Sequence, residues 1–230
     1  MTLDLSRIRA LIFDIDGTLR DTDDQMTHRL ARWLRPFTGL FHNRDPSLIA
    51  RRLIIASETP GALLLHLPDR LGFDEKLAQL GEFLYKLGII KPEKIFSLIP
   101  GVVEMLQTLH PLYPMSIVSS RGAQNSLAFL DAYNLSLYFV CVATAQTCKH
   151  TKPYPDPILW VAAQMDIPPD RCLMIGDTAV DMRAGKAAGA QTVGVLCGFG
   201  DEKELCEAGA DLILPVTTAL PEILSSSHLI

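Results

Sequence analysis

Short apolar runs that end in a charge, a serine or a glycine recur along the chain and predict strands. The first covers residues 8–13 and is closed by Asp14, with Gly17 shortly after it. Similar runs follow at residues 115–119, 139–143, 172–175, 192–196 and 212–214. Continuous short apolar runs bounded by turn residues are typical of strands buried on both faces of a parallel sheet. The pattern therefore predicts a parallel sheet.

Helical periodicity lies between these runs. Apolar residues at 102, 103, 106 and 109 keep a near-helical spacing after Pro100 and Gly101. Those at 158, 159, 162 and 163 do the same after Asp156 and Pro157, where proline suits a first helical turn. Repeated strand and helix units imply right-handed crossovers. We therefore expect an α/β fold whose core is a Rossmann-like, doubly wound parallel sheet.

Residues 21–97 break this alternation. Apolar residues at 26, 30, 33, 34 and 37 form one helical stripe, further helix-like patches follow, and no convincing strand pattern appears. We predict an α-helical cap at residues 21–97, inserted into a catalytic core formed by residues 1–20 and 98–230. An insertion directly after the first strand would lie over the carboxyl ends of the strands, where ligands bind in open α/β sheets.

Composition excludes several classes of protein. The chain has 230 residues, 48% of them hydrophobic, and a net charge of -5, which argues against a nucleic-acid partner. No apolar stretch approaches the roughly 20 residues needed to span a bilayer, so we expect no membrane partner. The five cysteines form no C-x-x-C pair and indicate reduced thiols. We expect a cytoplasmic protein, either a monomer or a homodimer.

Polar clusters at the ends of apolar runs carry the candidate chemistry. Burying an isolated carboxylate costs several kcal/mol unless it is paired or binds something. Asp14, Ser119 and Asp177 each follow a predicted strand and are expected to converge at one edge of the sheet, with Lys152 on a loop beside them. A phosphoryl group in transfer needs its charge neutralised and a nucleophile held in line. Together these residues predict a magnesium-dependent phosphoryl-transfer site.

The acidic residues divide the work of such a site. Asp14 can act as a nucleophile that forms an aspartyl-phosphate, and Asp16 can serve as general acid and base, provided that their environments differ. Mg²⁺ prefers hard oxygen ligands, which Asp14, Asp177 and the backbone carbonyl of Asp16 could supply. Asp181 could assist through water, because residues four apart share one helix face. Alternatively, Asp181 begins a helix, where its negative charge interacts favourably with the helix dipole.

The basic residues offer contacts for an anionic substrate. Lys152 would balance the carboxylates and the phosphoryl oxygens as a point charge. In the predicted cap, arginines greatly outnumber acidic residues over positions 28–52. Arg51 or Arg52 could reach a second anionic group on the substrate, although a solvated helix face also explains such a charge run.

In order and spacing, these motifs resemble the haloacid dehalogenase superfamily, within it the phosphoglycolate-phosphatase-like branch with a helical cap. The matching motifs are D-x-D-G-T-L at 14–19, a strand ending in serine at 117–119, K-P-x-P-x-P at 152–157 and G-D-x-x-x-D at 176–181. The resemblance implies these roles: nucleophile for Asp14, acid and base for Asp16, phosphate donor for Ser119, charge balancer for Lys152 and main acidic metal ligand for Asp177.

The resemblance also favours one reaction. Dehalogenases of the superfamily lack the second aspartate of the first motif, so the presence of Asp16 favours phosphate over halide. Many relatives carry asparagine after the motif-two residue, whereas this chain has Ser120 followed by Arg121. We predict that Ser119, Ser120 and Arg121 bind substrate.

We therefore predict a Mg²⁺-dependent phosphatase that hydrolyses a small phosphorylated metabolite, with phosphoglycolate as a candidate by resemblance. One alternative is a sugar-phosphate mutase of the same superfamily, which is less favoured because Met26 stands where a mutase has histidine. Another is a related protein that binds or regulates without turnover. A response-regulator receiver does not fit, because here the lysine precedes the second acidic motif.

Overall fold

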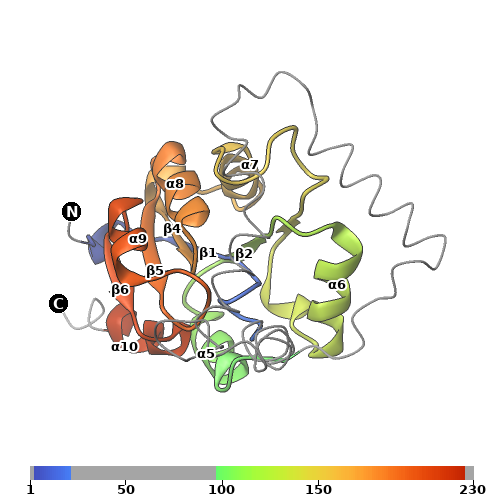
Figure 1. The fold of residues 1–230 in the computed structure, drawn as a ribbon. Coiled ribbons are helices and arrows are strands. Elements are labelled where there is room, and N and C mark those ends of the chain that lie inside the picture. Colours follow the sequence, from blue (N-terminus) through green and yellow to red (C-terminus); the bar gives the residue numbers. More distant parts are fainter. Residues whose placement is uncertain (1–2, 22–96, 226–230) are drawn as a thin grey trace, which may run out of the picture. The chain divides into compact units, whose positions relative to one another are not determined.

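The core of the protein is a parallel sheet of six strands (Figure 1). The computed structural model describes residues 3–21 and 97–225. The strands are β1 (Ala10–Phe13), β2 (Met115–Val118), β3 (Val142–Ala143), β4 (Cys172–Gly176), β5 (Gln191–Val195) and β6 (Leu212–Leu214). Their order across the sheet is β3-β2-β1-β4-β5-β6, and every neighbouring pair is parallel. The predicted Rossmann-like α/β core is confirmed.

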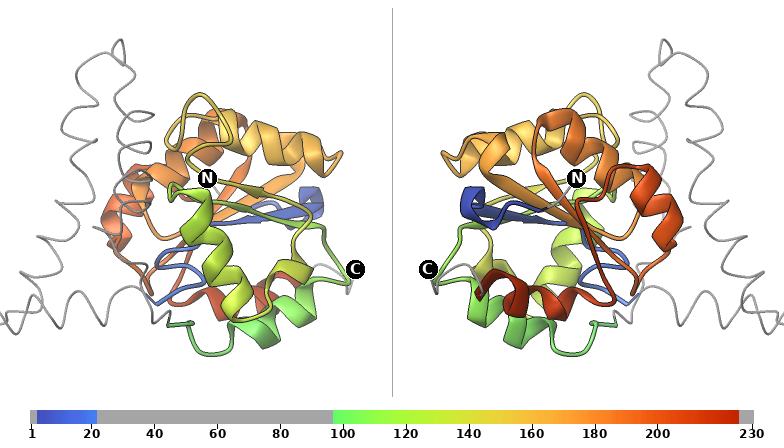
Figure 2. Two further views of the ribbon diagram at one scale, coloured as in Figure 1. Left: turned by 90° about the vertical axis from the view of Figure 1, so that its right-hand side faces the viewer. Right: turned by 90° about the vertical axis from the view of Figure 1, so that its left-hand side faces the viewer.

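Helices cover both faces of this sheet (Figure 2). The α-helices are α5 (Val102–Leu109), α6 (Ala123–Ala132), α7 (Asp156–Gln164), α8 (Ala179–Ala188), α9 (Glu202–Glu207) and α10 (Leu220–Ser225). Four 3₁₀ turns complete the described elements: η1 (Leu5–Arg7), η3 (Ser136–Tyr138), η4 (Pro169–Arg171) and η5 (Thr217–Ala219). Helices α5, α6 and α10 pack on one face, and α7 and α8 pack on the other, with α9 next to α8.

Successive strand residues point to opposite faces, and both faces are buried. On β1, Leu11 and Phe13 join the core beneath α5 and α10, whereas Ala10 and Ile12 join the core beneath α7. All four side chains of this strand are buried. Burial on two faces explains why the strands read as continuous apolar runs rather than as alternating patterns.

Some boundaries differ from the predicted ones. Strand β1 begins at Ala10 rather than at residue 8, because Ile8 closes the 3₁₀ turn η1 by donating its N–H to Leu5. The predicted run at 139–143 shortens to Val142–Ala143, which pairs with β2 at the edge of the sheet. The periodicity predicted α5 and α7 but not α6, α9 or α10.

The two described ranges end at Asp21 and resume at Ser97, and these two ends lie side by side. The N–H of Asp21 donates to the carbonyl of Ser97 over 2.9 Å, and Arg20 forms an antiparallel bridge with Leu98. Apart from its ends, the predicted cap at residues 21–97 falls outside the described residues, as do Arg51 and Arg52. The division into core and cap stays a prediction. Within the two described ranges, none of the helices has the length and apolarity needed to span a membrane.

Candidate active site

Two strands whose connections run in opposite directions meet at the centre of the sheet. From β1 the chain continues to β2 and β3 on one side, and from β4 it continues to β5 and β6 on the other. Asp14 directly follows β1, and its N–H donates to the carbonyl of Ile175 over 2.9 Å. Asp177 directly follows β4. Both carboxylates therefore lie at the carboxyl edge of the sheet, at the topological switch point where open α/β sheets bind ligands.

Asp14, Asp177 and Asp181 form a buried carboxylate cluster. They offer carboxylate oxygens that all lie within 4.8 Å of one another. The Nζ of Lys152 donates to Oδ1 of Asp14 and to Oδ1 of Asp181, each over 2.6 Å. The Lys152 side chain is only 3% exposed. The structure thus brings together four of the predicted site residues, with the lysine between two carboxylates.

The electrostatics of the cluster leave an excess of acidic groups. Burial raises the pKa of Asp14 to about 7; the Lys152 ammonium opposes this rise, and the neighbouring carboxylates of Asp181 and Asp16 add to it. Burial also raises the pKa of Asp177 well above its ordinary value. Although burial acts to lower the pKa of Lys152, its two carboxylate partners outweigh that effect and raise it. One cation among three buried carboxylates leaves room for a second cation.

Asp177 is held in a tight cradle that leaves one oxygen without a partner. The N–H of Phe199 donates to Oδ2 over 2.7 Å, and the N–H of Gly200 donates to the Asp177 carbonyl over 2.9 Å. A Cβ on Gly17 or Gly198 would come within 2.1 or 2.0 Å of Oδ2. Among the described residues, Oδ1 is buried and has no hydrogen-bond partner. Such an oxygen is costly unless something coordinates it, and a hard divalent cation fits it.

Asp181 reaches the cluster by a different route from the expected one. Asp177 lies before α8, in the turn that follows β4, so the two residues do not share a helix face and the expected reason for their proximity is wrong. Asp181 stands in the first turn of α8, as its alternative interpretation anticipated. Its Oδ2 accepts from the N–H of Thr178 over 3.1 Å and from its hydroxyl over 2.5 Å. The strand-to-helix turn, rather than the helix, brings the two carboxylates together.

The Asp16 side chain lies between two arginines. Its Oδ1 accepts from Nη1 of Arg20 over 3.4 Å, and its Oδ2 is paired with Nε of Arg121. The carboxylate of Asp16 is not a member of the cluster of three. None of the predicted site residues is Arg20; the available signal was a charge directly after an apolar residue in a loop that follows a buried strand.

The residues that follow β2 complete the described site. Ser119 is buried, donates its N–H to the carbonyl of Ala143 over 2.9 Å, and accepts from the N–H of Arg121 at its Oγ over 3.1 Å. Ser120 is exposed. Ser119 and Arg121 therefore lie at the same edge of the sheet as Asp14, and Arg121 forms an ion pair with Asp16.

The segment 198–200 is a loop that contacts Asp177, and none of the predicted motifs includes it. Its backbone N–H groups hold Asp177, and its first glycine allows the close approach described above. Two glycines flanking one residue at the end of a strand were the available signal.

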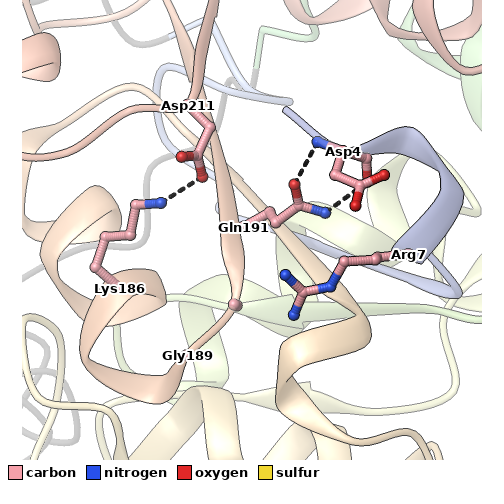
Figure 3. A pocket seen from close by; sticks show the side chains of 7 residues that line it. Asp4, Arg7, Lys186, Gly189, Gln191 and Asp211 are labelled. Atoms are coloured by element: carbon pink, nitrogen blue, oxygen red, sulfur yellow. Dashed lines mark hydrogen bonds and ion pairs between the residues drawn. The ribbon is translucent and has the colours of Figure 1, made fainter. Parts of the chain in front are cut away.

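A pocket of about 470 Å³ lies at the opposite, amino-terminal edge of the sheet (Figure 3). The Gln191 side chain accepts from the N–H of Asp4 over 2.6 Å and donates to its carbonyl over 2.8 Å, and Lys186 is paired with Asp211. These polar groups satisfy one another and tie the chain's first turn to the sheet. None of the predicted site residues lines this pocket.

Comparisons with known proteins show the family of the chain. The model of the haloacid dehalogenase-like hydrolases matches residues 11–195. A phosphoglycolate phosphatase of Pseudomonas savastanoi pv. phaseolicola is 26% identical, over 90% of this chain and 76% of the relative. The pyrophosphatase PpaX of Anoxybacillus flavithermus is 27% identical, over 94% of this chain and 97% of the relative. A hydrolase structure from Pseudomonas syringae has a TM-score of 0.63 at 28% identity and covers 95% of this chain and 98% of its own. The chain therefore belongs to the haloacid dehalogenase-like hydrolases, which confirms the family and the enzyme class, a hydrolase, that its motifs predict.

Proposed function

We propose that the protein is a Mg²⁺-dependent phosphatase that hydrolyses a small phosphate monoester through an aspartyl-phosphate. The observation that carries this proposal is the arrangement of Asp14. Lys152 occupies its Oδ1, no described residue donates to its Oδ2, and Asp177, whose Oδ1 has no hydrogen-bond partner among the described residues, belongs to the same cluster. This arrangement at one sheet edge supports the roles of nucleophile for Asp14, balancing cation for Lys152 and metal ligand for Asp177.

The donor set suits a hard cation. Asp14 and Asp177 would hold Mg²⁺ with the backbone carbonyl of Asp16, and Asp181 would assist through water, because Lys152 and Thr178 already occupy both of its oxygens. Bound there, Mg²⁺ would neutralise negative charge on the phosphoryl group.

The reaction divides into two steps carried by side chains of this chain. In the first, an Asp14 oxygen attacks phosphorus, the bond to the ester oxygen breaks, and Asp16 gives that oxygen a proton. In the second, Asp16 takes a proton from water, the water oxygen attacks phosphorus, and Asp14 is released with inorganic phosphate. Lys152 and the Ser119 hydroxyl would stabilise the charge on the phosphoryl oxygens.

The substrate class follows from the basic residues near the site. Arg121 is a half-buried cation at the site edge, and we propose that it binds substrate with Ser119, Ser120 and Lys152. Arg51 and Arg52 would bind a second anionic group. A small metabolite that carries a carboxylate or a second phosphate fits these cations, and phosphoglycolate is the candidate that the similarity to the phosphoglycolate phosphatase supports. A cytoplasmic location, a monomer or homodimer, and the absence of a nucleic-acid partner stay predictions.

The test is phosphate release from a panel of phosphorylated metabolites, including 2-phosphoglycolate and pyrophosphate, with and without Mg²⁺. We expect magnesium-dependent release by the wild type and none by Asp14→Asn, because the amide oxygen is a poor nucleophile. Asp170→Asn is the matched control, since Asp170 is an exposed residue paired with Arg7 away from the cluster. Release that persists in folded Asp14→Asn would refute the proposal. Silence of the wild type across the panel would favour a mutase or a binding role instead.

A further inference from the structure

Arg20 is a buried cation at the candidate site. Its side chain is 6% exposed, and its Nη1 lies 3.4 Å from Oδ1 of Asp16. Removing a guanidinium from water costs several kcal/mol and is compensated only when the charge is paired. A neutral or apolar side chain at this place would avoid that cost. The buried charge therefore points to a task for the pair that it forms with Asp16.

The main chain of Arg20 restrains the same loop. Its N–H donates to the carbonyl of Ile15 over 2.8 Å, and its carbonyl accepts from the N–H of Gly17 over 2.9 Å. These two bonds close the turn that carries Asp16. Backbone and side chain of Arg20 thus act on one short segment, and the guanidinium has little freedom to leave the Asp16 carboxylate.

The second arginine on Asp16 is anchored differently. Arg121 comes from the segment after β2, and its side chain is 27% exposed. A partly exposed cation in a separate segment can exchange its carboxylate partner for an anionic substrate, whereas the buried Arg20 is tied to the loop of Asp16 itself. The two arginines are therefore not equivalent partners of Asp16.

We propose that Arg20 is a positioning residue: its guanidinium donates to Oδ1 of Asp16 and so holds the Asp16 side chain in the orientation from which the protonated carboxyl group gives its proton to the leaving oxygen and the carboxylate takes one back from water. The inference deepens the proposed function and rests on it. The contact that carries the inference is the one between the Arg20 guanidinium and Asp16, so its effect should appear as a loss of the help that Asp16 gives.

That help depends on the leaving group. General acid catalysis contributes about 10² to 10⁴-fold when the leaving oxygen needs a proton. The leaving oxygen of 2-phosphoglycolate needs one, whereas 4-nitrophenolate leaves without it. The quantity to compare is kcat/KM, because it reports the steps up to formation of the aspartyl-phosphate and leaves out the later hydrolysis, which is common to both substrates.

The experiment measures kcat/KM of the wild type, Arg20→Met and Arg20→Lys with both substrates. We expect Arg20→Met to lower kcat/KM about 10²-fold for 2-phosphoglycolate and less than about threefold for 4-nitrophenyl phosphate. Arg20→Lys keeps the positive charge but lacks the fork of N–H donors that a guanidinium has, so its kcat/KM for 2-phosphoglycolate should lie between those of the wild type and Arg20→Met. Since both substrates are assayed on one preparation, the ratio of the two values does not depend on the folded fraction.

Two further variants separate positioning from a general structural role. In the Asp16→Asn background, Arg20→Met should lower kcat/KM for 2-phosphoglycolate by less than about twofold, because its effect passes through Asp16. Arg121→Met should instead raise KM for both substrates, and Arg7→Met serves as the distant control.

Equal losses with both substrates, or an undiminished loss in the Asp16→Asn background, would overturn the inference while leaving the phosphatase standing. If another alkyl phosphate of the panel is the better substrate, it replaces 2-phosphoglycolate in this comparison. A wild type that releases phosphate from no member of the panel would remove the proposed function, and the inference would fall with it.

Discussion

Replacement of Gly198 by alanine tests whether Asp177 must keep its exact position. A Cβ at residue 198 would lie 2.0 Å from Oδ2, 2.5 Å from Cγ and 2.6 Å from Cβ of Asp177. Ordinary contact begins near 3.4 Å, so the carboxylate would have to move by about 1.4 Å. Rotation of the side chain cannot relieve the clash, because the Asp177 Cβ is itself too close. The displacement must therefore reach the backbone.

The magnitude follows from this displacement. A misplacement of 1 Å in a catalytic site costs about 10²-fold in rate, which corresponds to about 2.7 kcal/mol of transition-state stabilisation. Loss of the 2.7 Å bond from the Phe199 N–H should also weaken Mg²⁺ binding by about 10- to 100-fold, the usual effect of removing a hydrogen bond that orients a metal ligand. We expect kcat/KM of Gly198→Ala to fall at least about 10²-fold.

The assay is magnesium-dependent phosphate release across a range of Mg²⁺ concentrations, with urea unfolding of the same preparation to confirm a folded protein. Gly122→Ala is the matched control. The backbone φ of Gly122 is -64°, which alanine adopts freely, and the added Cβ would meet only the flexible amide of Gln146, at 3.2 Å. We expect this control to stay within about threefold of the wild type. Wild-type activity and magnesium affinity in Gly198→Ala would refute the assignment of Asp177 as a precisely held ligand.

Three further predictions follow from the charges. Lys152→Met should abolish turnover and lower the free energy of unfolding in urea by about 3 kcal/mol at pH 8, because Asp14 and Asp181 lose their buried cation; equal stability at pH 8 would contradict the pairing. Because the pKa of Asp14 is raised from 3.8 to about 7, its bound proton stabilises the metal-free fold fully at pH values below 3.8. This contribution is lost as the pH rises through about 7. Urea titrations of chelator-treated wild type should therefore show a free energy of unfolding that falls between pH 3.8 and about 7. Asp14→Asn should show a smaller fall; a fall equal to that of the wild type would show that Asp14 is not the titrating group. Burial acts to raise the pKa of Asp211, but hydrogen bonds from Lys186 and Thr192 outweigh it and lower the pKa, so this residue stabilises the fold above its ordinary pKa and less as the pH falls. Asp211→Ala should cost about 1–3 kcal/mol of unfolding free energy at neutral pH with unchanged kcat/KM, because the residue lies at the far edge of the sheet; a loss of activity would show that the two edges are coupled.

Local patterns along the chain were sufficient for the sheet and for the residues at its carboxyl edge. The apolar run before Asp14 and the one before Asp177 predicted two strand ends, and parallel strands present their carboxyl ends at one edge. The lysine was found by its motif, and the structure places its ammonium between two carboxylates of the cluster. These features were predictable because burial and strand ends leave their marks within a few neighbouring residues.

Contacts between distant segments were decided only by the tertiary structure. The pairing of Arg121 with Asp16 joins residues 105 apart in sequence, and the N–H of Phe199 reaches Asp177 across 22. No periodicity records such contacts, because they depend on which strands become neighbours and on how each turn directs its side chains. The same reason explains why Asp177 and Asp181 are close through a turn and not along a helix. The amino-acid sequence by itself thus determined which groups lie at the carboxyl edge, whereas the folded chain decided which partners hold Asp16 and Asp177 in place.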